Sequence, residues 1–598
     1  MALRRFLFVI RHSSFVIQNM IPLRRNLPFL IIIGIYALSV VLVDPRGEFP
    51  LNDDWSYTRS AFFLGTQNRL HVDEWSAMSL IGQAIYGGVL VKIFKPGFLL
   101  LRLSTLVLSC GTALLLWALL RRIEVRPSLA WIAVLSWVFN PIQFCLAFTF
   151  MTEIPFLFFA LLGLFLYVLY LRSQRLWLLA AWSAVLGFGF LIRQTALLFA
   201  GPLLLTVLVE RNTRFRQRLG RASLAAAIFV SFVAGYYGWL LPHGGATPAT
   251  RRKLELLRYL TVEQFVGNSL GTLFYLSFLL LPLLIALIPL FYRASRSFKS
   301  WTRLTGLAAW AGVAAFGLWW FHAHYAQTGY LPSRAFHAQM PILLNVLYDS
   351  GLGPVTLDPT YYGPPATPVY PQVWYWVTVA VALGVVILGN LCTLGVFKLW
   401  SADRAEPWRP LLLAAGLAVL CVAAFETVFS HLQEGGLFDR HLLITALPLT
   451  VLLALMHSGL DDAKSGTRST PLVPLAAIML LVSAWFSVTA THDYLAWNRV
   501  RWNLGESLLE QKVDPLTISA GFEFNAWHNY DTFRARGNVG KVYYWWYDKR
   551  DYLISMSPEP GYQILQKKEY FSWLHRIPVA LYALQKRNSR QQADGSRQ

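Results

Sequence analysis

Two adjacent carboxylates, Asp53 and Asp54, lie a few positions after the first long apolar run of the chain, residues 28–43. Carboxylates at the boundary between lipid and water can accept a proton, bind a divalent metal ion, or do both. Packing against lipid gives no reason for charged side chains at this place. The pair could also belong to a solvated acidic loop without a chemical role, so the residues around it must decide.

Further reactive side chains lie at the ends of later apolar runs. Glu153 and Arg193 each occupy a tight turn, and Arg440 and His441 lie between the eleventh and twelfth runs. Carboxylates and guanidinium groups at one membrane depth suit a phosphate-bearing lipid, because arginine binds phosphate through two hydrogen bonds and a carboxylate can act as a base. Structural interpretations exist as well: the arginines could anchor helix ends in the head-group layer, and Glu153 could cap a helix.

The same carboxylates could hold a metal ion. Asp53, Asp54 and Glu153 together could bind Mg²⁺, Mn²⁺ or Zn²⁺, and without a cation such close carboxylates would raise the pKa of one of them. Three histidines could ligate zinc or manganese, although such residues more often make hydrogen bonds: His322, His324 and His337. The four cysteines fall inside apolar runs, without the spacing of a zinc site or a disulfide framework.

Membrane helices must position these residues. Of 598 residues, 56% are hydrophobic and 14% are charged, whereas a soluble protein carries about 25% charged residues. The apolar runs are about 15 to 25 residues long, enough to cross a hydrocarbon core of about 30 Å as helices. The net charge of +21 lies largely in short loops, so it reports topology and does not indicate a nucleic-acid partner.

We predict an all-α polytopic membrane protein with about 13 transmembrane helices in the lipid bilayer. The predicted spans are residues 28–43, 98–120, 128–148, 154–171, 176–191, 196–209, 223–241, 270–291, 304–321, 373–396, 411–429, 442–456 and 471–488. Lysine and arginine in alternate loops place the N-terminus in the cytoplasm and Asp53 outside it. One outer loop breaks this rule, because it carries Arg251, Arg252, Lys253 and Arg258.

The predicted domains are a cytoplasmic arm (1–27), a transmembrane domain (28–488) and a small extracytoplasmic α/β domain (489–598). The transmembrane domain has two long outer loops, at 44–97 and 322–372. Within the last domain, we predict strands at 516–520, 542–546 and 579–584, a helix at 563–573, and a disordered tail from about residue 587.

The order of these motifs resembles the GT-C superfamily of polyprenyl-phosphate-sugar-dependent glycosyltransferases. The resemblance is closest to the bacterial aminoarabinose transferases, with protein O-mannosyltransferases as relatives. Asp53-Asp54-Trp55-Ser56-Tyr57 is similar to the family's Asp-Glu pair followed by tyrosine, with Asp in place of Glu. Asp73-Glu74-Trp75 stands where the family has Glu before Lys-Pro-Pro, and that Lys-Pro-Pro is absent here. Arg102-Leu103-Ser104 resembles the family's Arg-Leu-Pro-Ser element.

Later motifs extend the resemblance over most of residues 25–490. Glu153 fills the place of the family's acidic residue after the third span, and Arg193 stands where the family has a lysine. Asp439-Arg440-His441-Leu442-Leu443 resembles its Arg-Tyr-Leu-Leu-Pro stretch.

The resemblance implies transfer of a sugar from a polyprenyl-phosphate carrier to a glycan, lipid or protein acceptor. The reaction would occur on the outer face of the bacterial cytoplasmic membrane, with inversion at the anomeric carbon. The implied base is Asp53, with Asp54 and Glu153 tuning its pKa or completing a metal site. The implied substrate-binding residues are Tyr57, Glu74, Arg102, Arg193, Arg440 and His441.

Two other functions stay open. A transporter or flippase for lipid-linked sugars would carry ionisable residues within its spans and often repeated halves. Here the spans contain few such residues, Glu426 and Arg102, and the sequence shows no repeat. A non-enzymatic assembly component is the third option, because the Lys-Pro-Pro element is missing.

Overall fold

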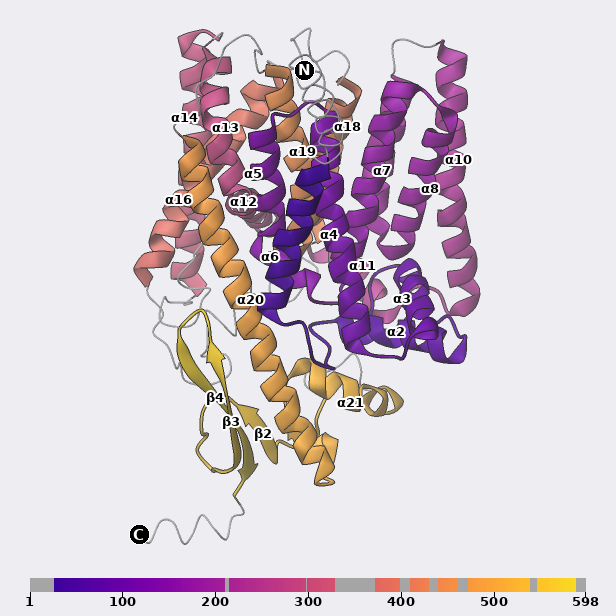
Figure 1. Ribbon diagram of the computed structural model, residues 1–598, viewed down its shortest axis with the longest axis vertical. Helices are drawn as coiled ribbons and strands as arrows, with labels where there is room; N and C mark the ends of the chain where they lie inside the picture. The colour runs from indigo at the N-terminus through magenta and orange to yellow at the C-terminus, as the bar shows by residue number, and fades with distance from the viewer. Residues whose placement is uncertain are drawn as a thin grey trace, which may run out of the picture.

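A bundle of apolar helices forms most of the protein, and α20 runs from it into a small C-terminal domain (Figure 1). This computed structural model describes residues 26–209, 214–296, 298–328, 371–397, 409–429, 439–460, 472–537 and 546–587. Several predictions fall outside this part of the chain: the arm up to residue 25, the outer loop between 329 and 370, the tail after 587, and the side chains of His322, His324 and His337.

Eight helices of the described chain are long and apolar enough to cross a membrane. They are Asn26–Val43, α4 (Phe98–Arg122), α7 (Glu153–Ser173), α10 (Phe215–Leu240), α14 (Ser300–Thr328), α18 (Arg409–Phe429), α19 (Leu443–Leu460) and α20 (Leu472–Glu510). The other predicted spans fall on two bent helix pairs, on the shorter helices α8 (Leu176–Ile192) and α9 (Leu197–Leu208), and on α16 (Pro371–Asn390), where the apolar helical segment is Val379–Thr393. The helical membrane class is confirmed, and the number of spans stays a prediction.

The two bent pairs were each predicted as one span. They are α5 (Pro127–Val138) with α6 (Pro141–Ala147), and α12 (Val262–Leu279) with α13 (Leu281–Ser295). The first pair bends by 59° and the second by 74°. At the first bend, the Asn140 side chain accepts hydrogen bonds from two backbone amides of α6, and Pro141 has no N–H for a continuing helix. Asn140 therefore starts a new helix direction inside the bundle.

The first outer loop contains two helices: α2 (Asp54–Gln67), which the sequence analysis did not predict, and α3 (Ile81–Ile93), which lies within an amphipathic stretch of the sequence, residues 76–94. The two helices pack closely where Gly65 of α2 faces Gly88 of α3. A Cβ atom on Gly65 would lie 2.8 Å from the carbonyl oxygen of Gly88, so only glycine fits at position 65. The backbone turns into α2 at Asn52, whose φ of 59° lies in the left-handed region that asparagine tolerates. This turn sets the acidic pair at the N-terminal end of α2.

The C-terminal domain combines one helix, α21 (Phe522–Ala535), with a four-stranded sheet in the order β1-β2-β4-β3. Its strands are β1 (Ile518–Ser519), β2 (Tyr552–Ser555), β3 (Tyr562–Ser572) and β4 (Ile577–Lys586). β1 runs parallel to β2, and the other pairs are antiparallel. The small α/β domain is thus confirmed, although the predicted boundary at residue 489 falls inside the continuous helix α20.

The prediction of a helix at 563–573 is wrong, because this segment is β3. Its Gln, Lys and Glu residues favour a helix locally, but they pair with β4 from Tyr562 opposite Lys586 to Ser572 opposite Ile577. The predicted strands at 516–520 and 579–584 are confirmed in part by β1 and β4. The predicted strand at 542–546 lies outside the described residues except for its last residue, which is in no strand.

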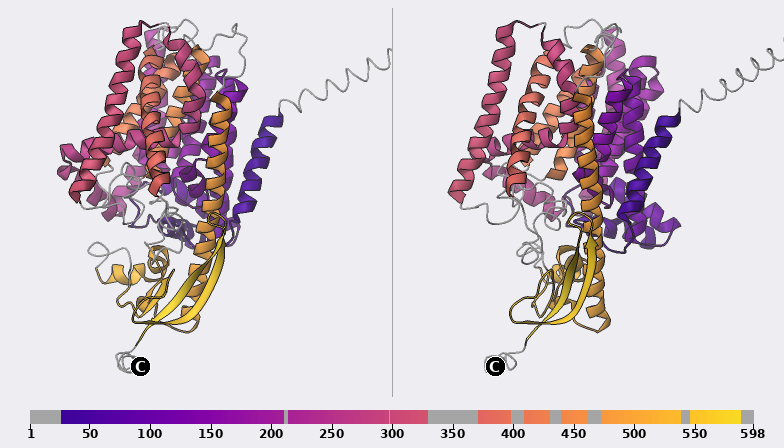
Figure 2. Two further views of the ribbon diagram at one scale, coloured as in Figure 1. Left: turned by 90° about the vertical axis from the view of Figure 1, so that its left-hand side faces the viewer. Right: turned by 60° about the vertical axis from the view of Figure 1, so that its left-hand side comes forward.

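The turn between β3 and β4 is fixed to α20 through one buried carboxylate. Asp493 accepts hydrogen bonds from the backbone N–H groups of Trp573 and Leu574, at 2.8 and 3.1 Å, and from the Ser572 hydroxyl. The ring of His492 stacks on Trp573 with 3.9 Å between ring centroids. These contacts hold the hairpin along α20 (Figure 2).

Candidate active site

Asp53 contacts two elements that are distant from each other in the sequence. Its Oδ2 accepts a hydrogen bond from Arg440 Nη2 at 2.9 Å, and its Oδ1 accepts one from the indole N–H of Trp75 at 2.9 Å. The Asp53 side chain is 20% exposed. A substrate can therefore approach this carboxylate while the arginine and the indole fix its orientation.

Glu153 forms a buried ion pair with Arg193. It is the first residue of α7, and Arg193 follows α8 directly. Nη1 of Arg193 donates to Glu153 Oε1 at 2.6 Å and to the Thr152 hydroxyl at 2.9 Å. The two side chains are 2% and 1% exposed. Because Arg193 compensates its charge and protein covers it, Glu153 is suited to holding Arg193 in place.

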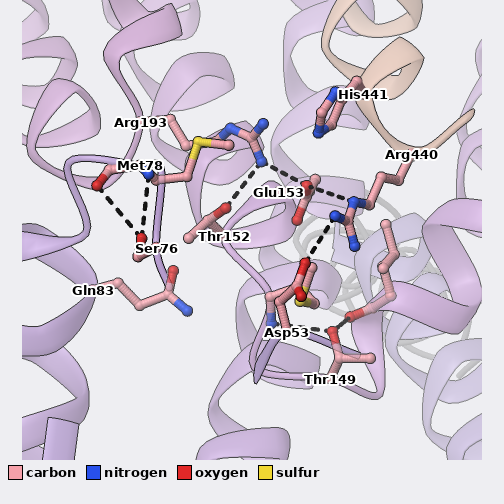
Figure 3. Close-up of polar contacts among 12 residues, drawn as sticks. Asp53, Ser76, Met78, Gln83, Thr149, Thr152, Glu153, Arg193, Arg440 and His441 are labelled. Atoms are coloured by element: carbon pink, nitrogen blue, oxygen red, sulfur yellow. Dashed lines mark hydrogen bonds and ion pairs between the residues drawn. The ribbon is translucent and has the colours of Figure 1, made fainter. Parts of the chain in front are cut away.

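Arg440 joins the two carboxylates into one cluster (Figure 3). It lies on the 3-10 turn Asp439–Leu442 that leads into α19. While Nη2 binds Asp53, Nε lies 3.7 Å from Glu153 Oε1. The structure thus brings together four residues that the sequence predicted to converge: Asp53, Glu153, Arg193 and Arg440.

Asp54 binds backbone groups and not the cluster. Its carboxylate accepts a hydrogen bond from the N–H of Leu51 at 2.6 Å and another from the N–H of Phe150 at 2.9 Å. Burial raises the pKa of Asp54 to about 7, although these two N–H groups act to lower the pKa. Asp54 therefore ties the first outer loop to the turn before α7.

The predicted metal site requires carboxylates that face one another. Asp53 and Glu153 each face an arginine, and Asp54 faces backbone amides. Among the residues that the structure describes, no group of three or more His, Cys, Asp or Glu side chains could hold a metal ion. The three carboxylates do not fit a shared ion in this arrangement, and metal dependence stays a prediction without support from these side chains.

Two further predicted binding residues lie beside the cluster. Tyr57, on the first turn of α2, is 5% exposed, and burial together with the negative charge of Asp53 raises its pKa. Nδ1 of His441 lies 3.4 Å from Oε2 of Glu426 on α18, and both side chains are buried. Glu426 was not among the predicted site residues.

Arg102 and Glu74 lie elsewhere. The Arg102 guanidinium is buried and donates to four backbone carbonyls, those of Pro45, Gly47, Phe49 and Phe148. With four of its N–H groups bound to carbonyls, Arg102 organises the first outer loop, and its contact with a substrate stays a prediction. Glu74 pairs with Arg534 of α21 at 2.6 Å on the surface.

Lys253 on α11 (Pro248–Leu256) is a cation of this region that the sequence analysis did not assign to the site. Two threonine hydroxyls of α11 and of its cap donate to the carbonyls of residues 76 and 77, which holds α11 against the first outer loop. Burial and the nearby charges of Arg440 and Arg193 lower the pKa of Lys253 to about 8. A signal existed in the sequence, since Lys253 belongs to the one outer loop that breaks the charge rule.

The cluster can bind an anion and accept a proton. Arg193, Arg440 and Lys253 supply positive charge, and guanidinium groups bind phosphate oxygens well. Asp53 is the more exposed of the two carboxylates at Arg440. A reaction between a phosphate-linked donor and a hydroxyl acceptor needs both kinds of group: cations that bind the phosphate, and a carboxylate that accepts the hydroxyl proton.

The fold and this cluster define a polytopic membrane protein with paired carboxylates and arginines at one end of its bundle. Residues 87–239 match the family model described as dolichyl-phosphate-mannose-protein mannosyltransferase. This match confirms the predicted resemblance to GT-C glycosyltransferases in a segment that contains Glu153 and Arg193. No curated protein matches the sequence.

Three solved structures are similar to the chain at low sequence identity. ArnT from Cupriavidus metallidurans bound to undecaprenyl phosphate is 14% identical, with 93% of this chain and 98% of that chain covered and a TM-score of 0.40. The apo state of the same ArnT is 13% identical, with coverages of 71% and 77% and a TM-score of 0.33. The arabinosyltransferase EmbB from Mycobacterium smegmatis is 15% identical, with coverages of 79% and 41% and a TM-score of 0.32.

Proposed function

We propose that this protein is a membrane glycosyltransferase that moves a sugar from a polyprenyl-phosphate carrier to an acceptor hydroxyl. The acceptor would be a glycan, a lipid or a protein on the outer face of a bacterial cytoplasmic membrane. The observation that carries the proposal is the contact of Arg440 with both Asp53 and Glu153, because it joins a partly exposed carboxylate, Asp53, to an anion-binding group.

Asp53 acts as the general base. The acceptor oxygen attacks the anomeric carbon of the sugar, and a new carbon–oxygen bond forms while the bond from that carbon to the phosphate oxygen breaks. The hydroxyl proton passes to Asp53, and the polyprenyl phosphate leaves with the electron pair. Direct displacement of this kind inverts the anomeric centre. The hydrogen bonds from Trp75 and Arg440 hold the carboxylate in one orientation.

The cations stabilise the leaving phosphate. Arg440, Arg193 and Lys253 lie close enough to Asp53 or Glu153 to share one electrostatic environment. Fixed positive groups that face the charge developing on a leaving group lower the activation barrier. Glu153 holds Arg193 in this position through the 2.6 Å ion pair.

The test is the Asp53→Asn variant in proteoliposomes that contain a polyprenyl-phosphate sugar and an acceptor. Asparagine keeps the size of the side chain but cannot take the proton, so the rate of transfer should fall at least about a hundredfold. Asp44→Asn is the matched control, because Asp44 lies in the same outer loop and pairs with exposed Arg46. Transfer at the wild-type rate by the Asp53→Asn variant would refute the assignment of the base.

A transporter for lipid-linked sugars is the second candidate, favoured by the buried contact between Glu426 on α18 and His441 on the 3-10 turn before α19. Ionisable pairs inside membrane spans often line a transport path. The Glu426→Gln variant distinguishes the two functions in the same proteoliposomes. A transporter would lose movement of the carrier across the bilayer in this variant, with Asp53→Asn unaffected.

A further inference from the structure

The C-terminal domain contacts the backbone immediately before Asp53. Glu523, on the first turn of α21, accepts a hydrogen bond from the N–H of Asn52 through Oε1 at 3.1 Å. Asn52 has a left-handed backbone conformation, which residues other than glycine adopt at some cost in energy. A residue more than 400 positions away thus holds the turn that delivers Asp53 to the cluster.

Glu523 is itself fixed from the other side. Its second oxygen, Oε2, pairs with Arg501 Nη2 at 2.8 Å, and the same Nη2 donates to Asn498 at 2.7 Å. Arg501 lies on α20, with its guanidinium carbon 4.4 Å from the ring centroid of Trp497. Because Arg501 is 3% exposed and Glu523 is 11% exposed, water weakens this ion pair little. Each carboxylate oxygen of Glu523 therefore has one defined partner.

An aromatic cluster makes the second connection between the domain and the site. Trp55 and Trp75 of the first outer loop pack against Tyr530 and Trp546 of the C-terminal domain. The ring centroids of Trp55 and Tyr530 are 4.9 Å apart, and those of Trp75 and Trp546 are 5.2 Å apart. Trp75 is also the residue whose indole N–H binds Asp53. The domain thus supports Asp53 in two ways: Glu523 binds the backbone before it, and the aromatic cluster holds Trp75, which binds its side chain.

Two further ion pairs lie at the edge of the contact between the first outer loop and the C-terminal domain. Arg59 of α2 binds Asp531 at 2.6 Å, and Arg534 binds Glu74 at 2.6 Å. Asp531 and Arg534 both lie on α21, the helix that carries Glu523. One face of α21 therefore contacts α2, the turn before α2 and the segment of Trp75 and Glu74.

We infer that the C-terminal domain is part of the catalytic unit and that Glu523 is a positioning residue for Asp53. Glu523 does not touch the substrate. It fixes the Asn52–Asp53 backbone so that the carboxylate meets the acceptor hydroxyl at hydrogen-bond distance. This inference rests on the proposed function for its kinetic part, and on the contact between Asn52 and Glu523 alone for its structural part.

Two variants at one position separate positioning from stability. Glu523→Gln keeps an oxygen that can accept the Asn52 N–H but loses the charge opposite Arg501, and Glu523→Ala loses both. Displacing a reacting group by about 1 Å can lower a rate about a hundredfold. We expect Glu523→Ala to lower kcat at least about tenfold with the KM for the donor nearly unchanged. We expect Glu523→Gln to retain most of kcat.

Hydrogen exchange gives a readout that does not depend on activity. In the full-length protein, the Asn52 amide should lose protection in Glu523→Ala and keep it in Glu523→Gln. Asp548→Asn is the matched control, because Asp548 belongs to the same domain and pairs with Arg536 on the surface, where it is 43% exposed. It should leave both kcat and the exchange of the Asn52 amide unchanged.

The outcomes are distinct. Equal losses of kcat in Glu523→Gln and Glu523→Ala that follow a lowered melting temperature would mean a structural role only, and would overturn the inference. Unchanged exchange at Asn52 in Glu523→Ala would overturn it as well. If the wild-type protein transfers no sugar, the proposed function fails, while the exchange measurement still tests the contact with Glu523.

Discussion

The two carboxylates that contact Arg440 differ in what surrounds them, and this difference separates their roles. Glu153 is 1% exposed and is paired with Arg193, whereas Asp53 is 20% exposed. A general base must reach its substrate and exchange its proton, so exposure favours Asp53. The buried carboxylate can only hold its arginine in place.

The charge of Lys253 leads to a prediction about pH. Its pKa of about 8 means that Lys253 is mostly charged at pH 7 and loses its proton as the pH rises toward 9. The phosphodiester of the donor keeps its charge over this range, so donor binding should weaken as the pH rises. We expect the KM for the donor to increase up to about tenfold, the value of one charge-assisted hydrogen bond.

The matched variant is Lys253→Arg, since arginine stays protonated over the whole range. It should remove the rise in KM while leaving kcat at pH 7 close to that of the wild type. The measurement is a pH series of initial rates at several donor concentrations. An identical KM profile in both proteins would show that another group titrates.

At the scale of elements, Arg102 links α4, the chain before α2 and the turn at Phe148. Lysine keeps the charge but has no planar group with which to bind four carbonyls at once. We expect Arg102→Lys to lower the free energy of unfolding in detergent by about 3 kcal/mol, the effect of leaving two or three buried carbonyls without donors. Arg122→Lys is the control, because Arg122 lies at the other end of α4 with an exposed side chain.

A measured loss of stability as small in Arg102→Lys as in Arg122→Lys would contradict this role. It would favour the predicted contact of Arg102 with the substrate. Denaturant titration of the two purified variants, followed by tryptophan fluorescence, distinguishes these cases.

The attachment of the hairpin to α20 is a second feature of this scale. In the Asp493→Asn variant, one carboxylate oxygen becomes an NH₂ group that cannot accept the backbone N–H bonds of the turn. The cost is about 1–3 kcal/mol. Hydrogen exchange in the turn between β3 and β4 should therefore be at least about tenfold faster. Glu510→Gln, an exposed position on the same helix, should leave that exchange unchanged. Equal exchange rates in the two variants would show that Asp493 does not hold the turn.

At the scale of the whole molecule, the contact between Asn52 and Glu523 requires the first outer loop and the C-terminal domain to lie on one side of the membrane. The charge distribution predicts that this side is outside the cytoplasm. An Asp548→Cys variant should react with a membrane-impermeant maleimide in right-side-out vesicles. A Lys299→Cys variant should react only after the membrane is opened. The native cysteines are replaced first, since Cys421 is exposed.

Labelling of Lys299→Cys in closed vesicles, with Asp548→Cys protected, would reverse the orientation. The proposed reaction would then take place on the cytoplasmic side. Labelling of both variants in closed vesicles would contradict the predicted number of spans between these positions.

The amino-acid sequence alone predicts the membrane class, the approximate position of the apolar helices and four residues of the cluster: Asp53, Glu153, Arg193 and Arg440. These features depend on local properties. The length of an apolar run decides whether it can span the bilayer, and short turns force the residues at neighbouring span ends to the same depth. The family resemblance further predicted that an early segment, with Asp53, and a late segment, with Arg440, belong to one site. The number and length of the spans alone do not predict this.

The pairing of the charged side chains becomes visible only in the folded protein. In the structure, Arg102 binds backbone carbonyls and Asp54 binds two backbone amides. Trp75 and Lys253 lie near the carboxylate of Asp53, and Glu523 binds the backbone of the preceding residue, Asn52. The tertiary structure also made a strand of a segment with helix-forming residues, because pairing with β4 outweighed local propensity. The physical reason is common to all these cases: a side chain's partner is set by contacts between segments far apart in the chain, and no spacing along the sequence encodes those contacts.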